Sequence, residues 1–222
     1  METMKRKPII AVVYNLMMAL ATATLGALVL SWPLLAIFVK VQKTELIVRK
    51  SLGIIMKNYT QLLDYLLLPF KNKLQMSDFP TSPSAARHFY ECKLLFELAI
   101  IVFIVGLIIL IFLKMRKRMN YIYISKTTAL IFMILPVIIL PFALMNFDEF
   151  FISFHHLLFN NSDWLFDPTT DPIINVLTEE FFAGCFATGG IIYELYFSCF
   201  ILTKKRSFNQ APFLILIFSL SK

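Results

Sequence analysis

The chain is organised around the stretch FHHLLFNNSDWLFDPTTDPIINVLTEEFF, residues 154–182, which lies between two long apolar segments. This stretch holds two of the three histidines, His155 and His156, and one of the two tryptophans, Trp164. Its acidic residues are Asp163, Asp167, Asp171, Glu179 and Glu180. No Lys or Arg occurs between residues 146 and 187, although the chain carries a net charge of +7. We interpret the stretch as a functional region that lies outside a membrane.

The composition is that of an integral membrane protein. Of the 222 residues, 59% are hydrophobic and 16% are charged, and the mean hydropathy is +0.75. Soluble domains have about 45–50% apolar and about 25% charged residues. One span needs about 20 apolar residues, so the apolar segments predict an all-α membrane protein with four transmembrane helices. Membrane orientation explains the positive charge, and we expect no nucleic-acid partner.

The apolar segments give approximate limits for the spans. We expect a single membrane domain over residues 1–206, with spans at about 8–30, 94–113, 129–144 and 182–202. Trp32 and Pro33 are expected to end the first span, because proline breaks helices and tryptophan favours the membrane interface. Pro136 and Pro141 are expected to kink the third span. Residues 207–222 form a short apolar tail to which we assign no role.

Two larger segments, residues 40–93 and 146–181, are too polar for lipid and are expected to form a cap on one side of the membrane. Within the first of them, apolar residues at helical spacing predict one helix over residues 45–68. Basic residues cluster instead in short segments at 5–7, 114–126 and 204–206, which by the positive-inside rule face the cytoplasm. The N-terminus is therefore expected in the cytoplasm. The first cap segment carries nine Lys and Arg residues, so the second, which has none, decides the orientation.

No familiar nucleophile motif occurs in the sequence. The three cysteines, Cys92, Cys185 and Cys199, form no CxxC pair, and neither a GxSxG elbow nor a glycine-rich phosphate loop is present. A disulfide framework and a serine hydrolase are both weakly supported. We therefore look to other side chains for chemistry.

The histidines are the strongest candidates for chemistry. His88 lies shortly before the second span, and His155 lies shortly after the third, so both are expected at the same membrane face. Histidine is suited to proton transfer near neutral pH, and two imidazoles at one site can act as general base and as general acid or oxyanion donor. His155 and His156 are adjacent, so their side chains diverge, and only one of the two is expected to face the site. The alternative is that all of them are ordinary interfacial residues.

The aspartates at 163, 167 and 171 are spaced by four residues, which on a helix would place them on one face. Pro168 and Pro172 favour turns instead, and turn capping is the simpler role. A metal site of His and Asp ligands is an alternative, although HExxH is absent. We expect neither a metal nor a cofactor.

Four blocks of the sequence resemble a known family, the lipoprotein intramolecular transacylases of Gram-positive bacteria. The most specific block is residues 154–182, quoted above, and RHFYECKLLF at residues 87–96 is similar to the block that precedes the family's second span. KNYTQLLDYLLLPF at residues 57–70 and DFPTS at residues 78–82 resemble the intervening patterns. Thr178 stands where the family pattern has proline.

The resemblance implies four spans, an extracellular cap and two catalytic histidines at the boundary between cap and membrane, which match His88 and His155. It implies the transfer of an acyl chain from the sn-2 oxygen of a diacylglyceryl-cysteine lipoprotein to the α-amino group of the same cysteine. The substrate is then a diacylated bacterial lipoprotein held within membrane lipid. The amine is the nucleophile, which agrees with the absence of a convincing Ser or Cys site.

Such a reaction needs a folded substrate pose, for which bulky walls and nearby acids are suited. Our candidates for substrate binding are Tyr59, Tyr65, Phe89, Phe154, Trp164, Asp163, Asp167, Asp171 and Phe182. The acids are expected to attract the cationic N-terminus of the substrate and to raise the basicity of a histidine. Two other functions stay open from the residues alone, a non-enzymatic membrane scaffold and a metal-dependent membrane hydrolase.

Overall fold

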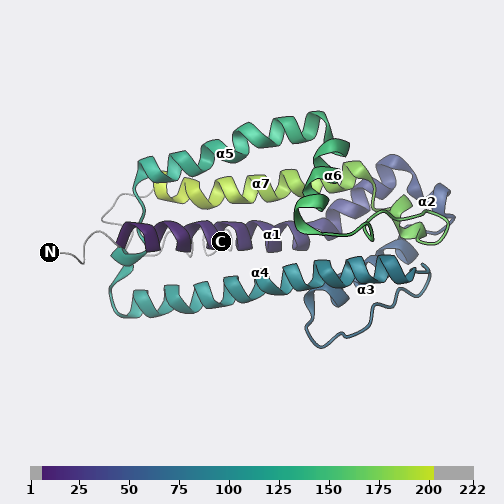
Figure 1. Cartoon of the computed structure of the whole chain (residues 1–222), viewed down its shortest axis with the longest axis horizontal. Coiled ribbons are helices and arrows are strands. Elements are labelled where there is room, and N and C mark those ends of the chain that lie inside the picture. The colour runs from purple at the N-terminus through teal and green to yellow at the C-terminus, as the bar shows by residue number, and fades with distance from the viewer. Residues whose placement is uncertain (1–6, 203–222) are drawn as a thin grey trace. The chain divides into compact units, whose positions relative to one another are not determined.

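The structure is a computed structural model that describes residues 7–202, and every regular element in this part of the chain is helical (Figure 1). The all-α prediction is confirmed. The elements are α1 (Lys7–Gln42), α2 (Thr44–Val48), α3 (Leu52–Leu67), α4 (Pro83–Met115), η1 (Met119–Tyr121), α5 (Lys126–Met145), α6 (Phe147–Leu158), η2 (Pro172–Asn175) and α7 (Glu179–Leu202). The basic clusters at 5–7 and 204–206, apart from Lys7, and the apolar tail at 207–222 lie outside the described residues.

Within residues 7–202, three helices are long and apolar enough to cross a membrane: Ile9–Gln42, Pro83–Met115 and Glu179–Leu202. A shorter apolar helix covers Lys126–Pro141. These helices expose large apolar side chains that a water-soluble protein buries; Ile108 in α4 and Val137 in α5 are more than 60% exposed. The protein is therefore an integral membrane protein.

Two helix limits differ from the sequence predictions. The first concerns Trp32 and Pro33: the helix does not end there, because α1 continues to Gln42, whereas the end of the membrane span at these residues stays a prediction. Leu35 and Val39 lie beyond the proline and are completely buried in a hydrophobic core, and this packing offsets the hydrogen bond that proline removes.

The prediction of a single helix over residues 45–68 is also wrong, because residues 49–51 are not helical and separate α2 from α3. Arg49 has φ of 52° in the left-handed region, which ends α2. Ser51 then begins α3 as its N-cap, and its hydroxyl accepts a hydrogen bond from the backbone N–H of Ile54. The helical spacing of the apolar residues continues across this break, which is why the sequence pattern does not reveal it.

The described chain divides into two compact units. The first comprises residues 7–24, 99–140 and 189–202. Its apolar core contains a buried polar group, Asn15, whose amide nitrogen donates to the carbonyl of Ile122 at 2.7 Å. The Asn15 side-chain oxygen accepts from the hydroxyl of Tyr196 at 2.9 Å, so that this amide connects three segments of the unit.

The second unit comprises residues 25–98 and 141–188 and holds both expected cap segments. Its core is built around the fully buried side chains of Leu35, Ile55, Ile173 and Phe181. Asp171 links the two segments, since its carboxylate accepts from the backbone N–H of Ser82 at 2.6 Å. Residues 167–171 form a turn, as the prolines of this stretch predicted.

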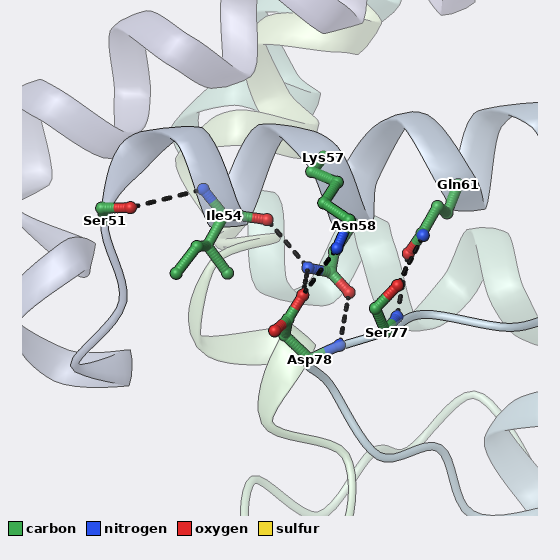
Figure 2. Close-up of polar contacts among 7 residues, drawn as sticks. All are labelled: Ser51, Ile54, Lys57, Asn58, Gln61, Ser77 and Asp78. Carbon is green, nitrogen blue, oxygen red and sulfur yellow. Dashed lines mark hydrogen bonds and ion pairs between the residues drawn. The ribbon is translucent and has the colours of Figure 1, made fainter.

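Side chains of α3 hold the irregular segment 68–82 in place (Figure 2). Asn58 is completely buried; its amide donates to the carboxylate of Asp78 at 2.8 Å, and its oxygen accepts from the Asp78 backbone N–H at 2.9 Å. Gln61 makes a similar pair of bonds with Ser77 nearer the surface. From α4, the buried ammonium of Lys93 donates to the backbone oxygens of Leu68 and Lys71.

Candidate active site

His88 lies in the second turn of α4. With a rise of about 1.5 Å per residue, this 33-residue helix is about 50 Å long, whereas the hydrocarbon layer is only about 30 Å thick. The apolar part of the helix is residues 94–113, in which Glu97 is the single charged residue. His88 therefore lies on the turns of α4 that precede the apolar span.

His155 is carried by α6, a 12-residue helix that begins after the non-helical residue Asn146. Phe147, Phe151 and His155 recur at every fourth position, and this spacing places them on one face of α6, on which Phe147 and His155 are buried. The Nδ1 atom of His155 lies 2.7 Å from the carbonyl oxygen of Phe151. A carbonyl only accepts, so Nδ1 of the neutral ring carries the proton and Nε2 keeps the free lone pair.

The two histidines come together, with ring centroids 5.5 Å apart and each side chain 7% exposed. Aromatic rings enclose them. Phe159 packs edge-on against His88 at 4.8 Å, and the indole of Trp164 lies 4.8 Å from the His155 ring. Phe166 lies 5.8 Å from His88.

Burial in these aromatic surroundings disfavours a charged ring. It lowers the pKa of His88 to about 4, with a smaller contribution in the same direction from His155, and the nearby carboxylate of Asp163 opposes both. Burial also lowers the pKa of His155, against the opposing hydrogen bond to the Phe151 carbonyl. Both imidazoles are therefore neutral at pH 7.

The ring nitrogens of His88 have unequal surroundings. Its Nε2 lies 3.4 Å from Sγ of Cys92, one helical turn further along α4. Its Nδ1 is buried and has no hydrogen-bond partner among the described residues. A buried polar atom without a partner is uncommon in proteins and marks a place that a polar ligand atom can complete.

Three of the predicted wall residues surround this pair. Phe89 lies 6.2 Å from His88, Phe154 lies 5.7 Å from His155, and Trp164 lies 4.8 Å from His155 with the two rings tilted by 31°. The indole N–H of Trp164 donates to the backbone oxygen of Asn161, which fixes the orientation of the ring. His156 is exposed, and its ring lies perpendicular to that of Trp164 at 5.3 Å.

The other predicted aromatic residues belong to the core of the second unit. Tyr59 is buried and donates to the hydroxyl of Ser31 at 2.6 Å, and Tyr65 is buried against the ammonium of Lys93. Phe182 packs against Phe151 at 5.4 Å, one ring further from the histidines. No described contact joins these three side chains to either imidazole.

The predicted acids are engaged within the protein. Asp163 forms an ion pair with Arg87 at 3.0 Å and lies close enough to act on the charge of His88. The backbone N–H and hydroxyl of Thr169 hydrogen-bond to Asp167 and lower the pKa of this carboxyl. Asp171 is buried and tied to the backbone of Ser82. Of the three acids, only Asp163 is near the histidines.

Four neighbours of the histidines were not predicted: Cys92, Phe151, Phe159 and Phe166. Three of them follow from helical spacing, since Phe151 precedes His155 by four residues, Phe159 follows it by four, and Cys92 follows His88 by four. No local signal identifies Phe166, which comes from the turn region. Within residues 7–202, no three His, Cys, Asp or Glu side chains gather into a group suited to a metal ion.

The chain is similar to known proteins over nearly its whole length. Residues 9–182 match the model of the family described as lipoprotein intramolecular transacylase Lit. The fold is similar to that of the membrane integral lipoprotein intramolecular transacylase Lit from Bacillus cereus, with TM-score 0.72 and 22% identity over 88% of this chain and 92% of that one. A second structure of that protein, with a histidine-to-arginine mutation, gives TM-score 0.65 and 20% identity over 99% and 96% of the two chains. None of the curated proteins matches significantly. The family match covers most of the sequence, and the chain therefore belongs to the lipoprotein intramolecular transacylase family.

Proposed function

We propose that this protein moves an acyl chain from the sn-2 oxygen of a diacylglyceryl-cysteine lipoprotein to the α-amino group of the same cysteine, with His88 and His155 as the catalytic residues. The observation that carries the proposal is the pair of buried, neutral imidazoles whose rings are 5.5 Å apart. The family acts on lipoproteins. The resemblance of residues 154–182 to the family supports the sn-2 oxygen as the position that loses the acyl chain and the α-amino group as the position that receives it.

The chemistry requires a proton acceptor and a proton donor. The amine must be neutral before its nitrogen attacks the ester carbonyl, and the N–C bond that forms places negative charge on the carbonyl oxygen. The C–O bond to the glyceryl carbon then breaks, and the departing sn-2 oxygen takes a proton. One proton leaves nitrogen and one reaches oxygen, so the histidine that takes up the first proton must release it to the departing oxygen before it returns to its starting state.

The structure supports a division of these roles. Because the proton of His155 is committed to the Phe151 carbonyl, its Nε2 is a free acceptor and suits the general base. His88 is then the donor that stabilises the oxyanion through the N–H of its unpartnered Nδ1. The imidazolium of His155 returns the proton that it took from nitrogen to the leaving oxygen. Low pKa values keep both rings in the neutral forms that this division needs.

The aromatic surroundings suit the geometry of the reaction. The attack closes a ring through the amine, the cysteine carbons, sulfur, two glyceryl carbons, the ester oxygen and the carbonyl carbon, and rings of this size close poorly without help. Rigid walls such as Phe89, Phe154 and Trp164 restrict the substrate to folded poses. They also exclude water, which would otherwise compete as the nucleophile.

The same proposal includes the membrane arrangement. We place the protein in the bacterial cell membrane as a four-span protein with a cytoplasmic N-terminus and the histidines at the extracellular face, where lipoproteins anchored in membrane lipid reach them. The absence of Lys and Arg between residues 146 and 187 supports this orientation.

Mass spectrometry of the N-terminal peptide of one lipoprotein tests the reaction, in cells with and without this protein. A diacylglyceryl peptide with a free amine is expected to become an N-acyl, monoacylglyceryl peptide of equal mass, distinguished by its fragments. His155→Ala is expected to slow the transfer by about 100-fold or more, because it removes the general base. His156→Ala is the matched control, since this neighbour is exposed, and should stay within about threefold of wild type. Unchanged fragments, or equal effects of the two substitutions, would refute the proposal.

A further inference from the structure

The division of labour between the histidines depends on which ring nitrogen of His88 carries the proton. A neutral imidazole has one N–H and one lone pair, and neighbouring groups choose between the two tautomers. For His155 the Phe151 carbonyl makes this choice. For His88, the sole described hydrogen-bonding contact is the one between Nε2 and Sγ of Cys92, at 3.4 Å.

Cys92 is placed as a fixed partner for that nitrogen. It follows His88 by one turn of α4, so that both side chains lie on the same face of the helix. Its side chain also packs against the core of the second unit, which restricts its movement. Burial raises the pKa of this thiol to about 12, so the sulfur keeps its hydrogen at neutral pH.

We infer that Cys92 is a positioning residue that donates its S–H to Nε2 of His88 and thereby holds the ring proton of His88 on Nδ1. His88 then offers an N–H and His155 offers a lone pair, so the two rings present complementary groups to the substrate. A thiol is a weak hydrogen-bond donor, but the His88 ring is buried, so water competes little for its Nε2. This inference deepens the proposed function and rests on it for its catalytic consequence.

The tautomer itself is measurable without any assay of acyl transfer. Protein labelled with ¹⁵N at histidine, purified in detergent, gives separate ring-nitrogen resonances for its three histidines, and His88→Gln identifies those of His88. The expected spectrum at pH 7 shows a protonated Nδ1 and an unprotonated Nε2 for His88. A protonated Nε2 in wild type would overturn the inference.

Substitutions at Cys92 test the cause. Cys92→Val keeps a side chain of similar size without a donor, and it is expected to move the His88 proton wholly or partly to Nε2 and to slow acyl transfer about tenfold, as the loss of one hydrogen bond predicts. Cys92→Ser keeps a donor and should retain the wild-type tautomer and transfer within about threefold. Cys185→Val is the matched control: this partly buried cysteine packs against the same core and makes no hydrogen bond with the described residues.

The outcomes separate the inference from the proposed function. If Cys92→Val leaves the His88 tautomer unchanged, the inference fails, whatever the activity. If the tautomer moves as expected in Cys92→Val while acyl transfer by the wild-type protein is absent, the inference about Cys92 stands and the proposed function fails. An equal loss of activity in Cys185→Val would show that Cys92 acts through packing alone and would overturn the positioning role.

Discussion

Two neutral histidines side by side leave unmet hydrogen-bonding capacity in a protein interior, because each ring brings an N–H and a lone pair that burial separates from water. In this protein, Phe151 satisfies one nitrogen of His155, and Cys92 approaches one nitrogen of His88. The remaining nitrogens are those that the proposed reaction uses. The site is thus incomplete without a polar ligand, as expected for a site that binds its substrate rather than for a core that only packs.

The lowered pKa of His88 predicts a dependence of stability on pH. The ring has a pKa of about 6.5 when unfolded and about 4 when folded, so the unfolded state binds protons more readily. Its contribution is fully present above pH 6.5 and is lost as the pH falls towards 4. In His88→Gln, the decrease in the free energy of unfolding that comes from protonation of His88 is absent. Between pH 7 and 4, the wild-type free energy of unfolding is expected to fall by roughly 2 kcal/mol more than that of the variant.

Denaturant unfolding in detergent at both pH values measures this difference. Carboxylates that do not interact with His88 titrate equally in the two proteins and cancel in the comparison, and His156→Gln serves as an exposed control. Identical pH dependence of the wild type and His88→Gln would show that His88 is not held neutral by burial.

At this scale the sequence predicted the pair and three of the rings around it, but not the groups that contact the ring nitrogens. His88 and His155 could be expected at one membrane face because each lies close to the end of an apolar segment. Their tautomers depend on contacts of 2.7 and 3.4 Å, which no pattern of residue types determines. Asp171 shows the converse: an acid in a promising position whose oxygens the fold uses to join Ser82 and Thr170.

The helices of the second unit are held by polar contacts as well as by apolar packing. Segment 68–82 has little regular structure. Side chains of α3 bind its backbone (Figure 2), and so does Lys93 of α4. The contacts differ in burial, since Asn58 is completely buried whereas the Gln61–Ser77 pair is exposed. Hydrogen bonds of similar length in these two environments are therefore expected to differ in their contribution to stability.

Asn58→Ala is expected to release this segment. The substitution leaves the backbone N–H of Asp78 without its acceptor and the Asp78 carboxylate without its neutral donor, at a cost of about 2 kcal/mol. Cleavage by trypsin after Lys71 or Lys73 should then be roughly 30-fold faster than in wild type, if the segment opens before it is cut. Gln61→Ala, the control on the same helix, should change the rate by about fivefold at most. Equal rates in the two variants would mean that burial does not decide the contribution of these bonds.

The helices themselves were predictable to different degrees. Long apolar runs predicted the membrane-spanning parts of α4 and α7, because a helix satisfies all backbone hydrogen bonds of such a run within lipid. α6 was not assigned, although Phe147, Phe151 and His155 follow helical spacing, because its 12 residues lie among turn formers. Pro33 within α1 and the left-handed Arg49 depend on tertiary packing, which sequence periodicity does not contain.

For the whole molecule, the central question is how many times the chain crosses the membrane. Three helices satisfy the length and hydropathy of a span, and the apolar part of α5 is shorter. The charge pattern favours a fourth crossing, since five basic residues lie between 114 and 126, and none lies between 146 and 187. Without a crossing by α5, this acidic segment would share the side of the basic one, contrary to the positive-inside rule.

Single cysteines introduced on either side of α4 and α5 test this arrangement. We expect Lys73→Cys and Asn160→Cys, both exposed positions, to react with a membrane-impermeant maleimide in intact cells. Arg116→Cys, also exposed, should react only after the cells are opened. The unsubstituted protein reports the background from its three native cysteines. If α5 does not cross, Asn160→Cys will behave like Arg116→Cys. Because His155 lies five residues before Asn160, that result would also separate it from His88 by the membrane, and the two-histidine site could not exist as proposed.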